Sequence, residues 1–322
     1  MINFVLASMI SLRFYLPLIK KIGGQNSRVF MLRGTKYNNP YLNRVSMDGF
    51  SKQYSFSVYD FDNINSHPAP FTFFLEGEGA DSIKYPSQKI SFTYCTDYTA
   101  LYRKYVDSVD KIIMPSEFAA KYYGVNGPKN LYLGNPQYEN IPCKEEILQK
   151  YQMKDGKKAM ILYPRYHVAD KINLPLLYSH LEKMGYLVIL KARGKEPAPA
   201  NVRPKYYVED GSWYPHPSLE LMKVSDLVIN YDSTAIEECI IMRRPVINFH
   251  VKPTFPLEFL YNYPYCRQLK TVYNFEDFKR DCEFLISANL SIYFEEAIEK
   301  YLYNSSGISD RILQNIGYEV KP

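Results

Sequence analysis

The chain has few cysteines and lacks several compact motifs by which enzyme and binding classes are recognised. Its five cysteines are scattered, no Cys-x-x-Cys pair occurs, and no Cys/His spacing fits a zinc site. There is also no P-loop, no His-Glu-x-x-His, no Gly-x-Ser-x-Gly and no protein-kinase motif set. These absences argue against zinc and disulfide scaffolds and against the enzyme classes that the motifs mark. We expect a reducing, cytoplasmic setting and no metal site.

Charge of one sign is not concentrated anywhere along the chain. The net charge is +5, yet basic residues occur at most in pairs such as Lys20–Lys21 and Arg243–Arg244. Nucleic-acid binders usually gather their basic residues on one stripe, so no nucleic-acid partner is expected. A mild, spread excess suits an anionic small substrate, and it leaves peripheral contact with an anionic membrane surface open.

The apolar stretch 2–19 resembles a membrane anchor, but Arg13 interrupts it and the longest uncharged run is shorter than a membrane span. We interpret it as a buried strand at 2–7 followed by a helix at 9–22. With 322 residues, 46% hydrophobic and 23% charged, the chain has the composition of a folded protein long enough for two domains.

Short apolar or β-branched runs alternate with helical patterns along most of the chain. Several runs are apolar on both faces, which is typical of strands buried in a helix-covered parallel sheet. One series of strands ends near residue 133 and a second begins after the turn-rich segment 134–142. This pattern predicts an α/β protein with two Rossmann-like domains whose parallel sheets face each other across a cleft. We expect domains at 1–140 and 141–290 and a helical tail at 291–322, with packing of the tail on the first domain left open.

The predicted strands are 3–7, 28–32, 54–59, 71–75, 90–94, 111–114 and 131–133 in the first series, and 159–163, 186–191, 205–208, 226–230 and 245–249 in the second.

The most informative segment is 225–249, in which a buried strand runs into Asp232-Ser233-Thr234-Ala235 and then into a helix. Ligands of parallel sheets bind just beyond the carboxyl ends of the strands, and a helix that begins there offers backbone amides to an anion. Ser233 and Thr234 add hydroxyl groups, and Ala235 lets a phosphate approach closely. An ordinary helix N-cap by Asp232 or Ser233 is the alternative.

Two acids, Glu237 and Glu238, lie one turn inside the helix that follows. A carboxylate there can accept hydrogen bonds from both hydroxyls of a ribose, although acid in a first turn also stabilises a helix by itself. Glu238 faces a ligand if Ile236, Ile240 and Ile241 take the core side.

Segment 225–249 resembles the donor-binding motif of the GT-B superfamily. That superfamily includes nucleotide-sugar glycosyltransferases, UDP-N-acetylglucosamine 2-epimerases and the CDP-glycerol glycerophosphotransferases of teichoic acid synthesis. Residues 232–235 are similar to the epimerases' Asp-Ser-Gly-Gly and the phosphotransferases' Asp-Tyr-Ser-Ser, with Thr and Ala in place of two glycines. Glu238, seven residues before Pro245, matches the spacing of the glutamate that holds the ribose in many members. Segments 113–118 and 134–136 resemble the end of a GT-B acceptor domain.

The resemblance implies a nucleotide-activated sugar as substrate and no cofactor. Arg165, His167, Lys191 and Arg193 follow two successive predicted strands and are candidates for neutralising the diphosphate without a metal ion. Solvated strand-end cations are the alternative. Trp213 stands roughly where the superfamily holds the base, and it is a candidate for stacking on that base or a core residue. The phosphotransferases' Lys-Pro-His-Pro has no histidine counterpart after Lys191.

A base that activates the acceptor is expected in the first domain. Glu76, Glu78 and Asp81 follow a buried strand in a Gly-rich loop, where burial would raise a carboxyl pKa toward neutrality. His67 and Asp97 rank behind them, and a plain polar loop is the alternative.

The sequence therefore predicts a metal-independent glycosyltransferase that moves a sugar from a nucleotide-sugar donor to a saccharide or lipid-linked saccharide acceptor. The resemblance implies a role in surface polysaccharide or glycoconjugate synthesis. Three alternatives stay open: CDP-alditol glycerol- or ribitol-phosphate transfer, UDP-sugar 2-epimerisation, and a non-catalytic subunit that binds a nucleotide sugar.

Overall fold

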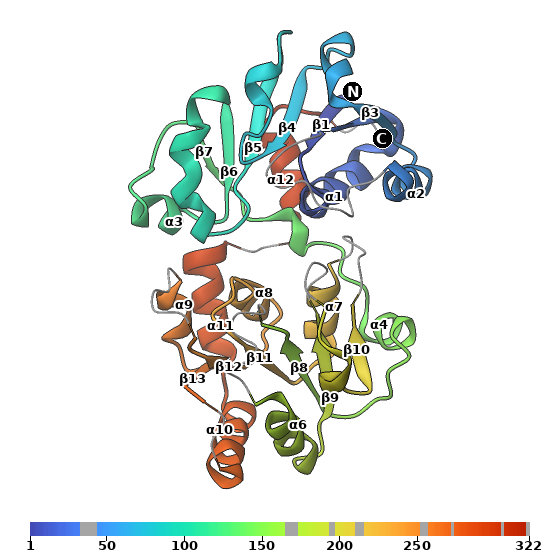
Figure 1. Ribbon diagram of the computed structural model, residues 1–322. Coiled ribbons are helices and arrows are strands. Elements are labelled where there is room, and N and C mark those ends of the chain that lie inside the picture. Colours follow the sequence, from blue (N-terminus) through green and yellow to red (C-terminus); the bar gives the residue numbers. More distant parts are fainter. Residues whose placement is uncertain are drawn as a thin grey trace. The chain divides into compact units, whose positions relative to one another are not determined.

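The structure, a computed structural model, describes residues 1–32, 44–164, 173–192, 197–209, 216–251, 257–271, 274–303 and 306–319. The chain forms two compact units (Figure 1). Unit 1 comprises Met1–Asn140 and Glu299–Pro322, and unit 2 comprises Ile141–Ile298. The chain therefore leaves unit 1 after Asn140 and returns to it after Ile298.

Unit 1 is built on a seven-stranded sheet in which every pair of neighbouring strands is parallel. Its order is β3-β2-β1-β4-β5-β6-β7. The strands are β1 (Ile2–Leu6), β2 (Ser27–Met31), β3 (Ser57–Asp60), β4 (Phe71–Leu75), β5 (Gln88–Phe92), β6 (Lys111–Met114) and β7 (Asn130–Tyr132), and the helices are α1 (Leu12–Ile22), α2 (Arg44–Tyr54), α3 (Glu117–Tyr122) and α12 (Ile308–Asn315).

The core of unit 1 contains a row of aromatic rings across its central strands. Phe4 of β1 stacks on Phe73 of β4 at 5.4 Å between ring centroids, and Phe73 stacks on Phe92 of β5 at 5.6 Å. All three rings are buried. Burial of a phenylalanine contributes roughly 1.5–3 kcal/mol, so these central strands anchor the sheet.

The last helix of the chain, α12, packs on unit 1. The carboxylate of Glu139 accepts hydrogen bonds from the backbone amide of Ser309 at 3.1 and 3.3 Å, at the start of α12. Arg311 donates to the carbonyl of Leu133 at 3.2 Å. These contacts join the C-terminal segment to the end of the first series of strands.

Unit 2 is built on a six-stranded, wholly parallel sheet with the order β10-β9-β8-β11-β12-β13. The strands are β8 (Lys158–Leu162), β9 (Leu187–Lys191), β10 (Tyr206–Val208), β11 (Leu227–Asn230), β12 (Val246–Phe249) and β13 (Cys266–Leu269). The helices are α4 (Lys144–Lys150), α6 (Leu174–Lys183), α7 (Pro217–Val224), α8 (Ile236–Ile241), α9 (Glu258–Tyr261), α10 (Phe275–Ser287) and α11 (Ser291–Ala297), and a π-helical turn, Ile298–Leu302, follows α11 and leads back to unit 1.

Counted from its own first strand, the sheet of unit 2 has the order 3-2-1-4-5-6 of a dinucleotide-binding, doubly wound fold. Unit 1 repeats this order and adds one strand at the end. The prediction of an α/β protein with two Rossmann-like parallel sheets is confirmed. Across the described residues, no helix is both long and apolar enough to cross a membrane.

Several elements differ from those expected from the sequence, and α2 lies where no helix was predicted. The strand expected at 54–59 begins only at Ser57, because α2 occupies the chain up to Tyr54. The sequence pattern at 97–108 indicates a helix, but these residues form a pair of 3-10 segments, Asp97–Lys104 and Val106–Ser108. Strand β13 was not predicted, since its two central residues are exposed and polar at the edge of the sheet.

Candidate functional site

The topology of unit 2 marks one position at which a ligand is expected. Strands β8 and β11 are neighbours, but the chain continues from β8 to β9 on one side and from β11 to β12 on the other. Doubly wound sheets bind their ligands beyond the carboxyl ends of the two strands at this switch point. The turn after β11, which contains the predicted residues Asp232 to Ala235, lies at such an end.

Asp232 ties the end of β11 to the end of β12. It is 1% exposed and has φ +45°, in the left-handed region that aspartate tolerates better than most residues. Its amide donates to Asn248 Oδ1 at 2.9 Å. Its carboxylate accepts from Asn248 Nδ2 at 2.8 Å and from the backbone amide of Val251 at 2.6 Å. The carboxylate is thus engaged inside the protein, where it shapes the turn.

A second set of hydrogen bonds fixes the peptide between Ser233 and Thr234. Buried Asn230 donates to Tyr261 Oη at 2.6 Å, and the Tyr261 hydroxyl donates to the carbonyl of Ser233 at 2.8 Å. The N–H of a trans peptide points opposite to its C=O. The amide of Thr234 is therefore directed away from the buried Tyr261.

Residues 233–235 are half-buried and lead into α8. Among the residues that the structure describes, the amides of Ser233 and Thr234 have no hydrogen-bond partner. The N-cap position of α8 is Ala235, which has no capping side chain, and the amide of Ala235 donates a hydrogen bond to Ser233 Oγ at 3.4 Å. Adjacent unpaired amides in a turn form a concave donor group that suits an anion.

Glu238 meets a histidine that was not among the predicted site residues. Ile236, Ile240 and Ile241 are buried in the core. Glu238 Oε1 lies 2.9 Å from Nε2 of His216, and the two side chains are 12% and 7% exposed. The pair joins α8 to the start of α7.

The hydrogen bond at Nδ1 of His216 determines which ring nitrogen carries the proton. His216 is the N-cap of α7, and its Nδ1 accepts a hydrogen bond from the amide of Ser218 at 3.2 Å. Because Nδ1 accepts, the neutral ring carries its proton on Nε2 and donates it to Glu238. Pro217, which suits the first position of a helix, was the sequence signal that could have placed His216 at a cap.

His250 is the other histidine that sequence reasoning missed. It follows β12 directly, is 41% exposed, and its Nδ1 lies 3.3 Å from the Asp232 carboxylate. A polar residue just beyond a strand next to β11 was the available signal. The buried carboxylate orients this imidazole, so Asp232 also serves as a support for His250.

Of the cations and the aromatic residue predicted as site residues in unit 2, the structure describes Lys191. Arg165, His167, Arg193 and Trp213 lie outside the described residues. Lys191 ends β9, is 9% exposed, and donates from Nζ to the carbonyl of Ala192 at 2.5 Å. Its ammonium group is therefore held by the backbone next to it.

Unit 1 has a corresponding switch point between β1 and β4, and Glu76 and Glu78 follow β4 there. Both are half-buried. Burial, opposed by a hydrogen bond with Thr93 and reinforced by the negative charge of Glu76, raises the pKa of Tyr105. Burial, opposed by Ser11 and reinforced by Glu78, likewise raises the pKa of Tyr15. The two carboxylates thus lie close to tyrosines of the core.

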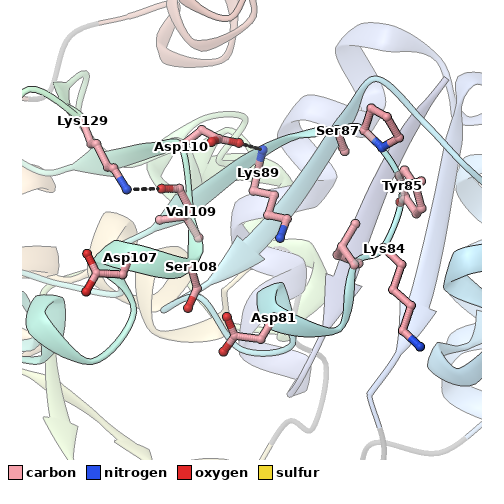
Figure 2. A pocket seen from close by; sticks show the side chains of 12 residues that line it. Asp81, Lys84, Tyr85, Ser87, Lys89, Asp107, Ser108, Val109, Asp110 and Lys129 are labelled. Atoms are coloured by element: carbon pink, nitrogen blue, oxygen red, sulfur yellow. Dashed lines mark hydrogen bonds between the residues drawn. The ribbon is translucent and has the colours of Figure 1, made fainter.

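Asp81 belongs to a different surface. It is exposed and lines a hollow of about 510 Å³, among the side chains drawn in Figure 2. The other residues of this hollow lie at the amino ends of β5, β6 and β7. Lys89 is at the start of β5, and the residues before the strands include Lys84, Asp107, Asp110 and Lys129. Two carbonyls, those of Val106 and Val109, each accept a hydrogen bond from Lys129 Nζ at 2.7 Å. The topology of unit 1 favours Glu76 and Glu78 over Asp81 as site residues.

The two lower-ranked candidates for the base, His67 and Asp97, lie beside different strands of unit 1. His67 precedes β4, and its Nδ1 lies 3.0 Å from the carbonyl of Asn63. Asp97 follows β5 and accepts a hydrogen bond from Tyr123 at 3.3 Å. Of the two, only Asp97 lies beyond the carboxyl end of a strand.

Several solved structures are similar to this chain over nearly its whole length. Neither a protein-family model nor a curated protein matches this sequence. A structure of the wall teichoic acid polymerase TagF matches with a TM-score of 0.63 at 15% identity, over 98% of this chain and 88% of that one. A UDP-GlcNAc 2-epimerase from Neisseria meningitidis, bound to UDP-GlcNAc, matches with a TM-score of 0.60 at 14% identity, over 98% and 99%. The glycosyltransferase of kitacinnamycin gives 0.58 at 12%, over 97% and 98%.

This chain therefore has the GT-B fold, as the motif at 225–249 indicated. At these identities the likeness establishes the architecture alone.

Proposed function

We propose that this protein is a glycosyltransferase that binds a nucleotide-sugar donor in unit 2, beyond the carboxyl ends of β8 and β11. The observation that carries the proposal is a combination of two amides with a carboxylate. The amides, at Ser233 and Thr234, have no partner within the described part of the chain, and the carboxylate, at Glu238, lies one turn further along. Amides suit the diphosphate and a carboxylate suits the ribose hydroxyls, so the two kinds of group match two adjacent parts of a nucleoside diphosphate.

The leaving diphosphate needs compensating charge. In this proposal the amides of the turn supply part of it, and cations from the neighbouring strand ends supply the rest without a metal ion. His250, which Asp232 orients, joins Arg165, His167, Lys191 and Arg193 as a candidate.

The proposed transfer has the following steps. The acceptor oxygen bonds to the anomeric carbon of the sugar, the bond between that carbon and the phosphate oxygen breaks, and the nucleotide leaves. A carboxylate of unit 1, Glu76 or Glu78, takes the proton of the acceptor hydroxyl. The acceptor is a saccharide or a lipid-linked saccharide, and the product is a surface polysaccharide or glycoconjugate, as the resemblance to the superfamily implies.

Calorimetric titration with UDP-, GDP-, CDP-, CMP- and dTDP-sugars tests the donor site. We expect one nucleotide class to bind, and nucleotide release to accelerate when a matching acceptor is added. No binding of any nucleotide would overturn the proposal.

The same experiment separates the alternatives. Release of CMP from a CDP-alditol would assign alditol-phosphate transfer. Interconversion of a UDP-sugar with its 2-epimer, without an acceptor, would assign epimerisation. Binding without turnover in any acceptor mixture would assign a non-catalytic subunit.

A further inference from the structure

We propose that His216 is a positioning residue that holds the Glu238 carboxylate ready for the ribose of the donor. This inference rests on the proposed function, since it assumes that Glu238 binds the ribose. It concerns a residue that neither the sequence motif nor the fold singles out.

The first step is the rigidity of the imidazole. His216 has one ring nitrogen on the amide of Ser218 at 3.2 Å and the other on Glu238 at 2.9 Å. Both bonds lie along the ring, so rotation about the side-chain torsions breaks at least one of them. A ring held at two points keeps its Nε2–H in a constant direction.

The start of α7, which carries His216, is itself held in place. Fully buried Glu220, one turn along α7, accepts hydrogen bonds from Lys150 Nζ at 2.7 Å and Tyr151 Oη at 2.6 Å. Lys223 donates from Nζ to the carbonyl of Pro142 at 2.7 Å. The helix that positions the histidine is therefore bound to α4 and to the segment before it.

The second step is the effect on the carboxylate. A glutamate side chain has three rotatable bonds, and ordering it costs conformational entropy. Here the Nε2–H of His216 selects the rotamer before a ligand arrives, which lowers the entropy cost of binding. The imidazole that donates this hydrogen bond is the neutral tautomer, so it does not neutralise the Glu238 carboxylate, which remains an acceptor for hydroxyl groups.

Two substitutions separate this role from helix capping. In H216N the asparagine oxygen still caps α7 through the amide of Ser218, but the side chain is too short to reach Glu238. In H216Q the amide nitrogen reaches the former place of Nε2, but the acceptor at the place of Nδ1 is lost. H216N thus removes the hydrogen bond to Glu238, and H216Q removes the hydrogen bond from the amide of Ser218.

The readout is discrimination between a ribonucleotide and its 2′-deoxy counterpart. Affinities for UDP, GDP and CDP and for 2′-deoxy-UDP, 2′-deoxy-GDP and 2′-deoxy-CDP are measured by calorimetry, with thermal unfolding measured in parallel. For the base that wild type binds, we expect about tenfold preference for the ribonucleotide. H216N should lose most of this preference with an unchanged Tm, whereas H216Q should keep the preference with a lowered Tm.

The outcomes that contradict the two proposals differ. If wild type binds no nucleotide, the proposed function fails. If wild type discriminates and E238A does not, Glu238 is confirmed as the ribose ligand, and undiminished discrimination by H216N then overturns the positioning role alone. Should H216N fold poorly, H216Q still decides the matter, because loss of discrimination in H216Q would contradict the proposal.

Discussion

The two units have the same strand order around their centres. The turns at their switch points differ in the residues that shape them and in the chemical groups that they present. In unit 1 the turn after β4 is tight because glycines occupy it, and it carries two glutamates. In unit 2 the turn after β11 is shaped by the buried carboxylate of Asp232, and it presents backbone amides. One turn thus carries negative charge, and the other presents hydrogen-bond donors.

This difference matches the division of work proposed for a transferase. A carboxylate can act as the base that removes a proton, whereas a diphosphate needs hydrogen-bond donors and positive charge. The same topology therefore supports complementary chemistry, because the residues of a single turn decide what the carboxyl end of a central strand presents.

The largest effect is expected from Gly77→Ala in the turn of unit 1. Gly77 has φ +67°, and an added Cβ would lie 2.4 Å from Cβ of Tyr105. Backbone strain and overpacking together should lower the free energy of unfolding by about 3 kcal/mol. Gly124→Ala is the matched control, since Gly124 has φ +62° with no atom within 4 Å of an added Cβ. Denaturant unfolding should show a loss of about 1 kcal/mol there, and equal losses would refute the packing argument.

Asp232→Ala tests the turn of unit 2. The change leaves the amide of Val251 and the Asn248 side chain without their acceptor, which should cost about 2 kcal/mol of unfolding free energy. Asp155→Ala serves as the control, because the Asp155 side chain is 79% exposed in its ion pair with Lys144. A loss in Asp232→Ala no greater than in the control would show that the polar network does not hold the turn.

Glu238→Ala should weaken nucleotide binding about tenfold or more in Kd, which corresponds to about 1.4 kcal/mol, through loss of the ribose contact. Glu237→Gln, at the neighbouring buried acid, should leave Kd unchanged. The sequence could not choose between these two acids, and calorimetry on both variants makes the choice. An effect confined to Glu237→Gln would reverse the assignment.

The smallest effect concerns thiol reactivity, which reports on packing in both units. Cys143 is exposed, whereas the other four thiols are buried. Burial, with the charges of Asp281 and Glu283, raises the pKa of Cys282 to about 12. Since the thiolate is the reactive form, a thiol reagent should modify one cysteine in the native protein and five after unfolding. Rapid modification of a second thiol in the native state would contradict the burial described for that cysteine.

Most of the fold could be predicted from the sequence because buried parallel strands are apolar on both faces. The strands expected at 71–75 and 111–114 match β4 and β6, and the strand expected at 226–230 differs from β11 by one residue. Edge strand β13 has exposed polar residues and gives no such signal. Helix α2 carries Gly49 in its interior, which weakens the helical pattern.

Part of the candidate site could also be predicted from the sequence. The turn at Asp232 and the acid at Glu238 belong to one continuous motif, so their proximity follows from the sequence. His216 comes from another helix, and His250 pairs with Asp232 across two strands. Such pairs depend on tertiary packing, which spacing along the chain does not reveal.

Hydrogen–deuterium exchange with and without a bound nucleotide tests the central claim most directly. The account predicts that the nucleotide slows exchange at the amides of Ser233 and Thr234 and in peptides that contain His216 and Glu238. Protection confined to peptides around Asp81 and Lys129, with no change at 231–238, would contradict it.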